Sequence, residues 1–538
     1  MRFKGVIAFL VSTLLVTGVS SAHSDPIDFS SLPTADHDLA RRAIAVMSHE
    51  YRGLPIEIGD SEGHEHSLCG TFGALELRTE VSYASKLTQH ALATLFQRPR
   101  HALSMVSPSG RFLVHYDLDG FHAVDPTDAD RSGHPDYVDE AGKAFDEAWE
   151  HIVDQLGYTP PPSDGDGLFD ICVRDLSPTG RYGATYPETL SLTLPSYIEI
   201  DNNFTDPVYV TFGLDALRFT AAHEFFHSVQ FGYYLSIEAT WWYELTATWM
   251  QDEVFTEVND HYSLVNAYLG FPEAAMYEQP PITLRPYGAM ILGVHLASVY
   301  GEATIRETFE DLAARSPNPY TITDSDQGFP GGFAGVLPRY WIWNYFTGSR
   351  AQGSRYYAEA SAYQEVSAQE ITPIGSLTLG GASQVQGMGA SYARVNTGGK
   401  TGGLEVSFTL PSGPTWNLDV LLVKGSGFEL IHPQGTTVTI PNAGDYDEVV
   451  FIPSVLSLGA QIYDLSYSVR MAASVTAWSD RVADFDHNGE VGFEDFIVFA
   501  DSFGQAAESQ NSHTDPNSDG RVDFEDFLVF ASHFGEGD

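Results

Sequence analysis

The spacing of apolar residues predicts helices in the middle of this chain and strands on either side of them. Phe212–Tyr234 (FGLDALRFTAAHEFFHSVQFGYY) has no proline and repeats apolar residues three or four positions apart. Because they cover nearly every face, the segment is predicted to be a buried helix. A second helix is predicted at Ala239–Glu253. Alternating residues predict earlier strands at 110–116, 168–173 and 190–200, so this region is expected to be an α+β domain.

Beyond about residue 370 the pattern changes to short alternating strands separated by Gly, Pro, Asn and Asp. Five segments carry it: 404–410, 418–423, 436–440, 448–452 and 463–469. This arrangement is typical of an all-β, antiparallel sandwich of about 100 residues. Substrate or surface binding and packing against the preceding domain are both compatible with it.

The N-terminus has the pattern of a secretory signal. An apolar run, Gly5–Val19, follows Arg2 and Lys4 and ends in the small residues Ser20-Ser-Ala22. Residues 1–22 are therefore predicted to be a signal peptide, since the run is short for an uncleaved anchor. No other stretch approaches ~18 apolar residues, so the mature chain is expected to be secreted and to have no membrane span. Residues 23–105 carry helical patterns at 36–51 and 80–96 and form either a propeptide or an N-terminal subdomain.

The segment His223-Glu224-Phe-Phe-His227 has the spacing of a zinc site. Residues i and i+4 share a helix face, so both histidines can bind one ion, with Glu224 beside the water that zinc activates. A catalytic zinc ion takes three protein ligands and keeps one position open, and Glu244 on the second helix is the candidate third ligand. The alternatives are two core histidines satisfied by hydrogen bonds, and a helix-terminal glutamate favoured by the helix dipole.

Gln230 and Tyr233 stand where the motif HExxHxxGxxH requires Gly and His, which excludes that pattern. HExxH followed by a helical glutamate, here in WYELTATW around Glu244, resembles the gluzincins, the thermolysin-like and aminopeptidase-like zinc peptidases. The resemblance implies a zincin-like catalytic domain with Glu224 as general base and three zinc ligands: His223, His227 and Glu244.

Tyr287 precedes a Gly-Ala-initiated apolar helix and resembles a tyrosine that several gluzincins carry there. The resemblance implies that it donates a hydrogen bond to the oxyanion, whereas packing is its alternative role; His261 and His295 are the substitute donors. The predicted activity is hydrolysis of protein or peptide substrates by zinc-activated water. Two alternatives are a catalytically silent zincin-fold scaffold and a carbohydrate-associated hydrolase, although no carboxylate pair in a recognisable motif supports the latter.

The C-terminus contains a 31-residue repeat with the spacing of EF-hand-type calcium loops. The predicted calcium positions are Asp484, Asp486, Asn488, Glu490 and Asp495 in the first copy, and Asp515, Asn517, Asp519, Arg521 and Asp526 in the second. The paired loop-helix units resemble type I dockerins, which implies a small α domain and a cohesin-like or cell-surface partner. An earlier loop has the same spacing, with predicted calcium ligands Asp128, Asp130, Ser132 and Asp139; an Asp-rich surface turn is the alternative.

The net charge of −45 argues against nucleic acid and anionic membranes as partners. It suits calcium binding or a saline environment. The two cysteines, Cys69 and Cys172, are compatible with one disulfide or with unlinked thiols, and a third interpretation has the Cys69 thiolate capping the zinc in a latent form.

Together these patterns predict a multi-domain chain. The expected units are a signal peptide at 1–22, an N-terminal region at 23–105, a zinc metallopeptidase-like catalytic domain at 106–368, a β-sandwich at 369–479 and a dockerin-like domain at 480–538.

Overall fold

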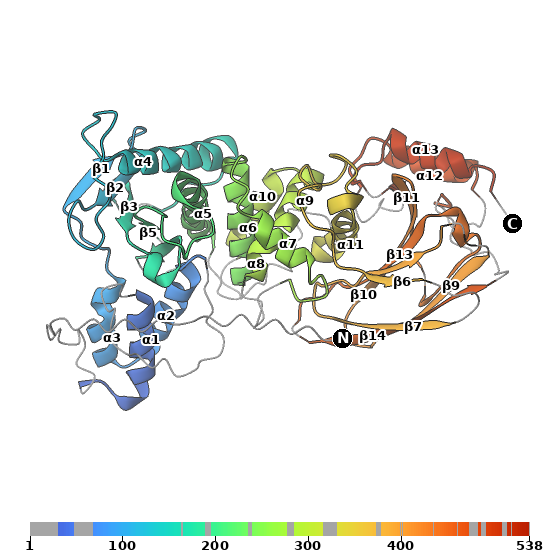
Figure 1. The fold of residues 1–538 in the computed structure, drawn as a ribbon, viewed down its shortest axis with the longest axis horizontal. Helices are drawn as coiled ribbons and strands as arrows, with labels where there is room; N and C mark the ends of the chain where they lie inside the picture. Colours follow the sequence, from blue (N-terminus) through green and yellow to red (C-terminus); the bar gives the residue numbers. More distant parts are fainter. Residues whose placement is uncertain are drawn as a thin grey trace.

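The computed structural model describes residues 31–47, 68–162, 165–188, 195–234, 239–276, 284–315, 331–372, 378–398, 400, 402–433, 435–459, 461–472, 483–485, 491–507, 514–517 and 519–536. It is elongated and multi-domain, with helices and mixed or antiparallel sheets (Figure 1). The predicted signal peptide lies outside the described residues, as do Asp486, Asn488 and Glu490. The larger parts of the structure are the mixed-sheet part (68–366), the sandwich part (369–472) and the C-terminal part (483–536).

The mixed-sheet part contains a five-stranded sheet of order β1-β2-β3-β5-β4. Its strands are β1 (Leu103–Val106), β2 (Phe112–Tyr116), β3 (Phe169–Arg174), β4 (Gly183–Pro187) and β5 (Ser196–Asp201). β2, β3 and β5 are parallel, whereas β1 and β4 are antiparallel strands at the two edges. Three predicted strands are confirmed, although β5 begins later than expected. β4 was not predicted, and together with β5 it runs beside the HExxH helix.

Helices pack on this sheet and extend away from it. α4 (Asp136–Trp149) continues into a π-helical turn (Glu150–Gln155) and contacts α5 (Gly213–Tyr233), which packs on β4, β5 and α6 (Thr240–Val254). Beyond them lie α7 (Tyr262–Leu269), α8 (Arg285–Gly288), α9 (Met290–Tyr300), α10 (Ala303–Ala314) and α11 (Gly332–Tyr345) (Figure 1). The predicted burial of α5 is confirmed, because apolar side chains on nearly all its faces enter one core. No single described helix is long and apolar enough to span a membrane. The segments Arg285–Tyr300 and Ala303–Ala314 reach that length and apolar character only when taken together, and a bend of 103° separates them.

Three N-terminal helices lie beside the sheet: α1 (His37–Met47), α2 (Thr71–Tyr83) and α3 (Lys86–Leu92). α1 agrees with the prediction over the described residues, but the single helix expected at 80–96 is wrong. The chain leaves α2 after Tyr83, and Ser85 caps α3 by accepting a hydrogen bond from the Thr88 N–H at 3.2 Å. α2 packs against β4, which places the residues at its N-terminus close to α5.

The sandwich part consists of two sheets that share one apolar core. The first has order β11-β10-β13-β8-β6 and the second β12-β9-β14-β7. The strands are β6 (Gln369–Ile371), β7 (Leu379–Val385), β8 (Ala393–Asn396), β9 (Gly403–Thr409), β10 (Trp416–Lys424), β11 (Gly427–Ile431), β12 (Thr437–Ile440), β13 (Glu448–Val455) and β14 (Tyr463–Ala472). All five predicted strands are present. The expectation of purely antiparallel pairing is wrong at one edge, where β6 runs parallel to β8.

The C-terminal part packs two helices, α12 (Phe493–Ser502) and α13 (Phe524–His533), around stacked phenylalanines. The Phe499 and Phe530 rings lie 6.2 Å apart with an interplanar angle of 5°. This unit lies above β11 in Figure 1. Arg339 of α11 reaches into it, with Nη2 at 3.1 Å from Asp515 Oδ2 and Nη1 donating to the Ala507 carbonyl at 3.1 Å.

Candidate active site

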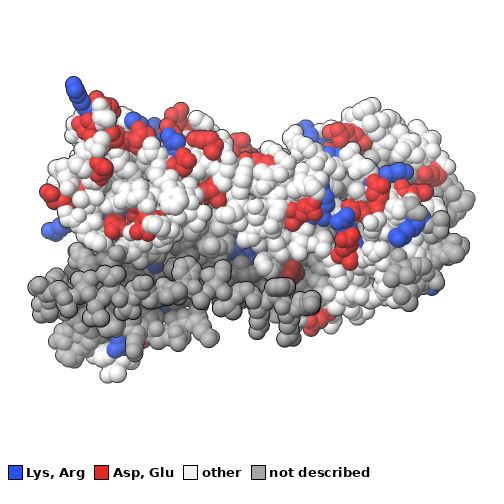
Figure 2. Space-filling model, viewed as in Figure 1, with Lys and Arg blue, Asp and Glu red and all other residues white. Residues whose placement is uncertain are grey.

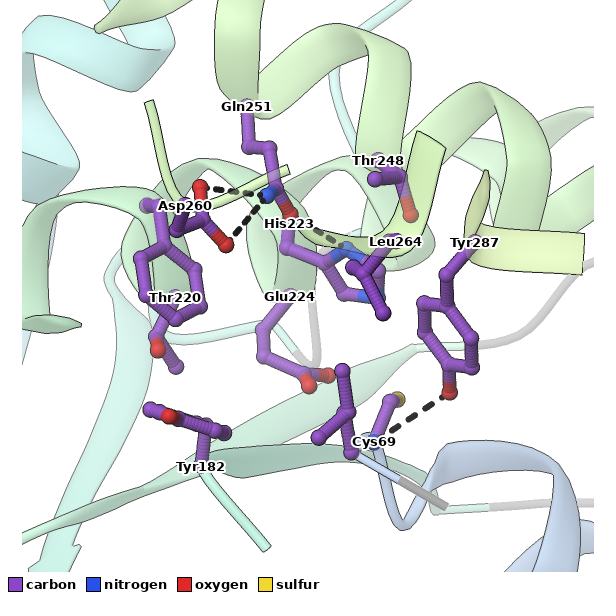
Figure 3. Close-up of a pocket in the computed structure, with 12 residues that line it drawn as sticks. Cys69, Tyr182, Thr220, His223, Glu224, Thr248, Gln251, Asp260, Leu264 and Tyr287 are labelled. Atoms are coloured by element: carbon purple, nitrogen blue, oxygen red, sulfur yellow. Dashed lines mark hydrogen bonds between the residues drawn. The ribbon is translucent and has the colours of Figure 1, made fainter. Parts of the chain in front are cut away.

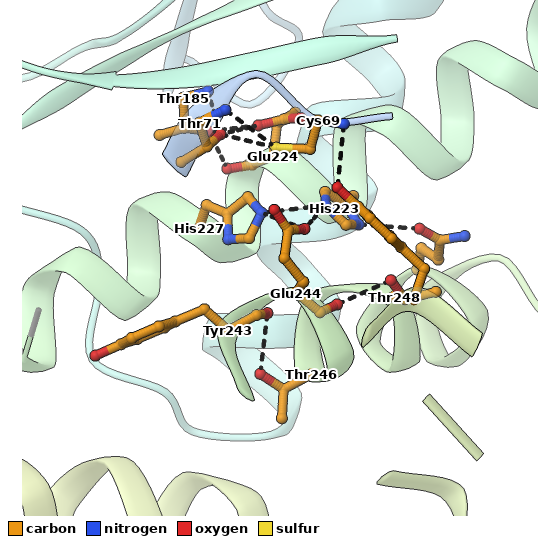
Figure 4. Close-up of polar contacts among 12 residues, drawn as sticks. Cys69, Thr71, Thr185, His223, Glu224, His227, Tyr243, Glu244, Thr246 and Thr248 are labelled. Carbon is orange, nitrogen blue, oxygen red and sulfur yellow. Dashed lines mark hydrogen bonds and ion pairs between the residues drawn. The ribbon is translucent and has the colours of Figure 1, made fainter. Parts of the chain in front are cut away.

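The structure brings His223, His227 and Glu244 together at the contact between α5 and α6 (Figure 4). The two Nε2 atoms are 3.1 Å apart, and Glu244 Oε2 lies 3.2 Å from His223 Nε2 and 3.5 Å from His227 Nε2. A tetrahedral ion with bonds of about 2.0–2.1 Å would separate its ligands by about 3.3 Å. The three atoms therefore have the spacing of three corners of a zinc tetrahedron. All three side chains are buried.

Two glutamines orient the histidine rings. His223 Nδ1 lies 3.1 Å from Gln251 Oε1, and His227 Nδ1 lies 2.7 Å from Gln230 Oε1. The Gln251 amide donates to Asp260 at 3.1 Å, and the Gln230 amide donates to the Tyr243 carbonyl at 3.0 Å, so in each glutamine the oxygen is left to face the ring. Each Nδ1 then carries the proton, and each Nε2 presents a lone pair to the shared centre.

Neither glutamine was identified from the sequence. A signal was present, because Gln230 follows His227 by three residues and Gln251 follows Glu244 by seven. Both spacings place a polar side chain on the same helix face as a candidate ligand.

Glu224 is buried beside this set and bonded to two threonines (Figure 4). Its Oε2 accepts hydrogen bonds from the hydroxyls of Thr71 at 3.0 Å and Thr185 at 2.8 Å. Gly183 makes the close approach of β4 possible, because a Cβ there would lie 2.8 Å from Glu224 Cγ. The carboxylate is thus fixed in position next to the histidines, where a general base is required.

Cys69 lies at the same centre. Of the alternatives that the sequence left open for the two cysteines, the structure has unlinked thiols. Neither cysteine is in a disulfide, since Cys172 is buried in β3 within a separate apolar cluster. A ligand atom from each of Cys69, His223, His227 and Glu244 lies within 4.8 Å of the other three. Burial and the charges of Glu224 and Glu244 raise the pKa of the Cys69 thiol, so a thiolate at this position would require a cation.

Tyr287 projects into the site from α8 (Figure 3). Its ring stacks on His223 with centroids 6.0 Å apart, and its hydroxyl oxygen accepts a hydrogen bond from the Cys69 backbone N–H at 3.3 Å. His261 and His295, the substitute donors, do not line the cavity at this site. His295 packs against Trp343, and His261 lies between Asp252 and Glu359 in a separate buried cluster.

The cavity beside His223 and Glu224 is small (Figure 3). Its volume is about 20 Å³, and its lining includes Leu68, Cys69, Tyr182 and Tyr287. A water molecule needs about 10–15 Å³ measured in this way, so the described walls leave room for about one.

Glu244 and His227 favour opposite charges at this centre. Burial raises the pKa of Glu244, but hydrogen bonds with His223 and His227 outweigh this effect and bring it to about 2. Burial lowers the pKa of His227, but the hydrogen bond to Glu244 outweighs that effect and raises it. A carboxylate and an imidazole that both favour their charged forms leave a place for positive charge that a divalent ion would fill.

The second C-terminal loop gathers three of its predicted calcium ligands. Carboxylate oxygens of Asp515, Asp519 and Asp526 lie within 4.8 Å of one another, and Asn517 Oδ1 accepts from the Asp519 N–H at 2.9 Å. Burial, together with the neighbouring carboxylate charges, raises the pKa of Asp515 to about 6 and that of Asp526 to about 8. The Arg521 side chain is exposed, so only its backbone carbonyl can take part.

The other predicted calcium positions are less complete. In the first repeat Asp484 and Asp495 are buried, and the ligands between them lie outside the described residues. In the earlier loop, Asp128 and Asp130 accept bonds from the Ser132 N–H at 3.0 and 2.9 Å, and the Ser132 hydroxyl donates to Asp139. The third carboxylate near Asp128 and Asp130 is that of Asp136. Calcium binding stays a prediction for all three loops.

No known protein-family model and no curated protein matches this chain. Its function is therefore argued from the geometry of the site.

Proposed function

We propose that this chain is a secreted, zinc-dependent peptidase of gluzincin type. The observation that carries the proposal is the ligand set of His223, His227 and Glu244, whose Nε2 and Oε2 atoms are 3.1–3.5 Å apart, with Glu224 held beside it. Soft and borderline nitrogen donors with one carboxylate favour zinc over calcium or magnesium.

Zinc, when bound, lowers the pKa of a water ligand from ~15.7 to ~7 and polarises a carbonyl. Glu224 accepts the proton of the attacking water and delivers it to the leaving amine. Thr185 holds this carboxylate in position, and Tyr287 donates its hydroxyl proton to the carbonyl oxygen as negative charge develops there. Loss of one such donor costs about 3 kcal/mol of transition-state stabilisation.

The acidic surface agrees with a role outside the cell. Acidic side chains lie over both ends of the face shown in Figure 2, and Asp and Glu outnumber Lys and Arg by 72 to 27 in the whole chain. Calcium in the C-terminal loops would offset part of this charge.

The test is zinc stoichiometry combined with cleavage of a diverse peptide library. Glu224→Gln should keep zinc and lose turnover, whereas His223→Ala should lose zinc. Asp215→Asn is the matched control, because Asp215 is exposed on the same helix α5. Cleavage that survives Glu224→Gln, or an absence of bound zinc, would contradict the proposal.

We also propose that the C-terminal part binds a cohesin-like or cell-surface partner. Its two copies expose equivalent large apolar residues, 31 positions apart: Phe493, Ile497 and Phe503 in the first and Phe524, Leu528 and Phe534 in the second. Phe493→Ser with Phe524→Ser should abolish capture by immobilised cohesin, with calcium-dependent folding of the module unchanged. Capture at full strength would contradict the partner assignment.

A further inference from the structure

We propose that Cys69 is the fourth protein ligand of the metal and that Leu68–Thr71 thereby hold the peptidase in a latent state. This inference rests on the proposed function. In a catalytic zinc site the fourth position admits the water that reacts, so a protein thiolate in that position blocks the reaction. The Cys69 thiol lies with the other three ligands within 4.8 Å, although it is 154 positions before His223 in the sequence.

The same segment contacts the other two residues assigned to the reaction, Tyr287 (Figure 3) and Glu224 (Figure 4). The Cys69 backbone N–H donates to the Tyr287 hydroxyl at 3.3 Å, and the Thr71 hydroxyl donates to Glu224 Oε2 at 3.0 Å. One short stretch of chain thus meets the metal ligands, the oxyanion donor and the general base together. A segment that packed here only to fill space would not require polar contacts with all three.

The segment also lies along an edge of the mixed sheet. The Gly70 N–H donates to the Gly183 carbonyl at 2.9 Å, and the Tyr182 N–H donates to the Leu68 carbonyl at 3.0 Å. Cys69 pairs with Gly183 as a parallel bridge at the edge strand β4. Extended peptides commonly bind proteins by adding a strand to such an edge. Leu68–Gly70 therefore take the position along β4 that a substrate backbone would occupy.

The small size of the cavity beside Glu224 is consistent with an active site that the Leu68–Thr71 segment blocks. Leu68 and Cys69 form part of the wall that leaves about 20 Å³ beside Glu224. The described walls leave room there for about one water molecule. Activation then requires that the segment leave: the sulfur–metal bond breaks, a water takes the vacated position, and the sulfur takes a proton from solvent. No oxidant or reductant is involved.

Cobalt(II) loading of the full chain tests the ligand directly, because a thiolate bound to cobalt gives a sulfur-to-metal charge-transfer band in the near ultraviolet. We expect this band in the parent and in Cys172→Ala, and its loss in Cys69→Ser with cobalt still bound at one equivalent. Cys172→Ala is the matched control, since Cys172 is the second buried cysteine and lies outside the ligand cluster.

Measurement of peptide turnover distinguishes a Cys69 ligand that keeps the peptidase latent from one that is a permanent structural ligand. Cys69→Ser should cleave a fluorogenic peptide faster than the parent by about tenfold or more, where each tenfold corresponds to about 1.4 kcal/mol. A band without any gain in turnover would overturn latency. Equal spectra of cobalt-loaded parent and Cys69→Ser would overturn the ligand assignment and leave the peptidase proposal standing.

Failure of the peptidase proposal has a different signature. In that case the parent would not bind cobalt at one equivalent, or His223→Ala would bind it as well as the parent does. If Cys69→Ser does not fold, the spectra of the parent and Cys172→Ala still decide the ligand, because only Cys69 can supply the thiolate in the latter.

Discussion

Gly183 on β4 and Glu224 on α5 approach so closely that a single methyl group would not fit between them. A Cβ on Gly183 would lie 2.8 Å from Glu224 Cγ and 3.1 Å from the Glu199 carbonyl oxygen. The second contact is to backbone, so the strand cannot yield without disturbing the sheet. The position of the proposed general base therefore depends on the absence of a side chain on its neighbouring strand.

Gly183→Ala should displace Glu224 and lower kcat by about 10- to 100-fold, since a shift of about 1 Å at a reacting group has effects of this size. Zinc content should not change. Peptide turnover is measured in the Cys69→Ser background so that latency does not mask the effect. Gly73→Ala on α2 is the control, because its Cβ would meet nothing within 4 Å. Full activity of Gly183→Ala would show that Glu224 tolerates displacement.

Gln251→Ala should weaken zinc binding by about 10- to 100-fold, because it removes the acceptor that fixes the tautomer and orientation of His223. Competition with a chromogenic chelator measures the affinity. Gln384→Ala, at an exposed position on β7, should leave it unchanged. Equal zinc affinity in both variants would mean that the ring is held by packing alone.

Glu253→Gln should change how stability depends on pH. Burial, with the nearby charges of Glu302 and Asp252, raises the pKa of Glu253 from 4.5 to about 7. The folded chain thus binds this proton more tightly than the unfolded chain, so the stabilisation is complete below about pH 4.5 and is lost as the pH rises to about 7. Across this pH range the free energy of unfolding of the parent should fall by about 2–3 kcal/mol, and that of the variant should not show this fall.

Thermal unfolding from pH 5 to 8.5 tests this prediction. Glu253→Gln should be the more stable protein at pH 8, and its advantage should shrink toward pH 5. Glu257→Gln removes the same charge at an exposed position and serves as the control. If Glu253→Gln is more stable than the parent by the same amount at every pH, the raised pKa of Glu253 would be refuted as the cause.

Calcium should raise the unfolding temperature of the C-terminal part by mass action, because binding relieves the mutual repulsion of Asp515, Asp519 and Asp526. Asp526→Asn should reduce the number of bound calcium ions by one in isothermal titration, whereas Asp501→Asn, at an exposed position on α12, should not. An unchanged stoichiometry in Asp526→Asn would remove this loop from the set of calcium sites.

The helices that carry the candidate metal ligands were predictable because their own sequences determine them. Gly213–Tyr233 and Thr240–Val254 match the expected segments within about one residue, since long apolar patterns without proline have few alternatives. Likewise, the i, i+4 spacing requires His223 and His227 to share a face. Glu244 joined them as predicted because helix α6 packs directly on α5.

The features that were missed depend on contacts between distant segments. β4 is a five-residue strand containing glycine and proline, so its own pattern is weak. The contacts of Cys69 and Thr71 with residues about 150 positions later are determined by how α2 packs on β4, which no local periodicity encodes. The state of the two cysteines was left open for the same reason, because cysteine count does not reveal that Cys172 lies in another cluster.

The guanidinium of Arg339 limits where this protein can be shortened. Arg339 as a residue is 8% exposed, and its guanidinium is bonded to a carboxylate and a carbonyl of the C-terminal part. A chain that ended near residue 480 would leave this charge on helix α11 without those acceptors, beside the Val299 surface that Gly520 now covers. The last 50 or so residues therefore cover part of the helical surface around α11, and removing them is expected to produce a less soluble protein.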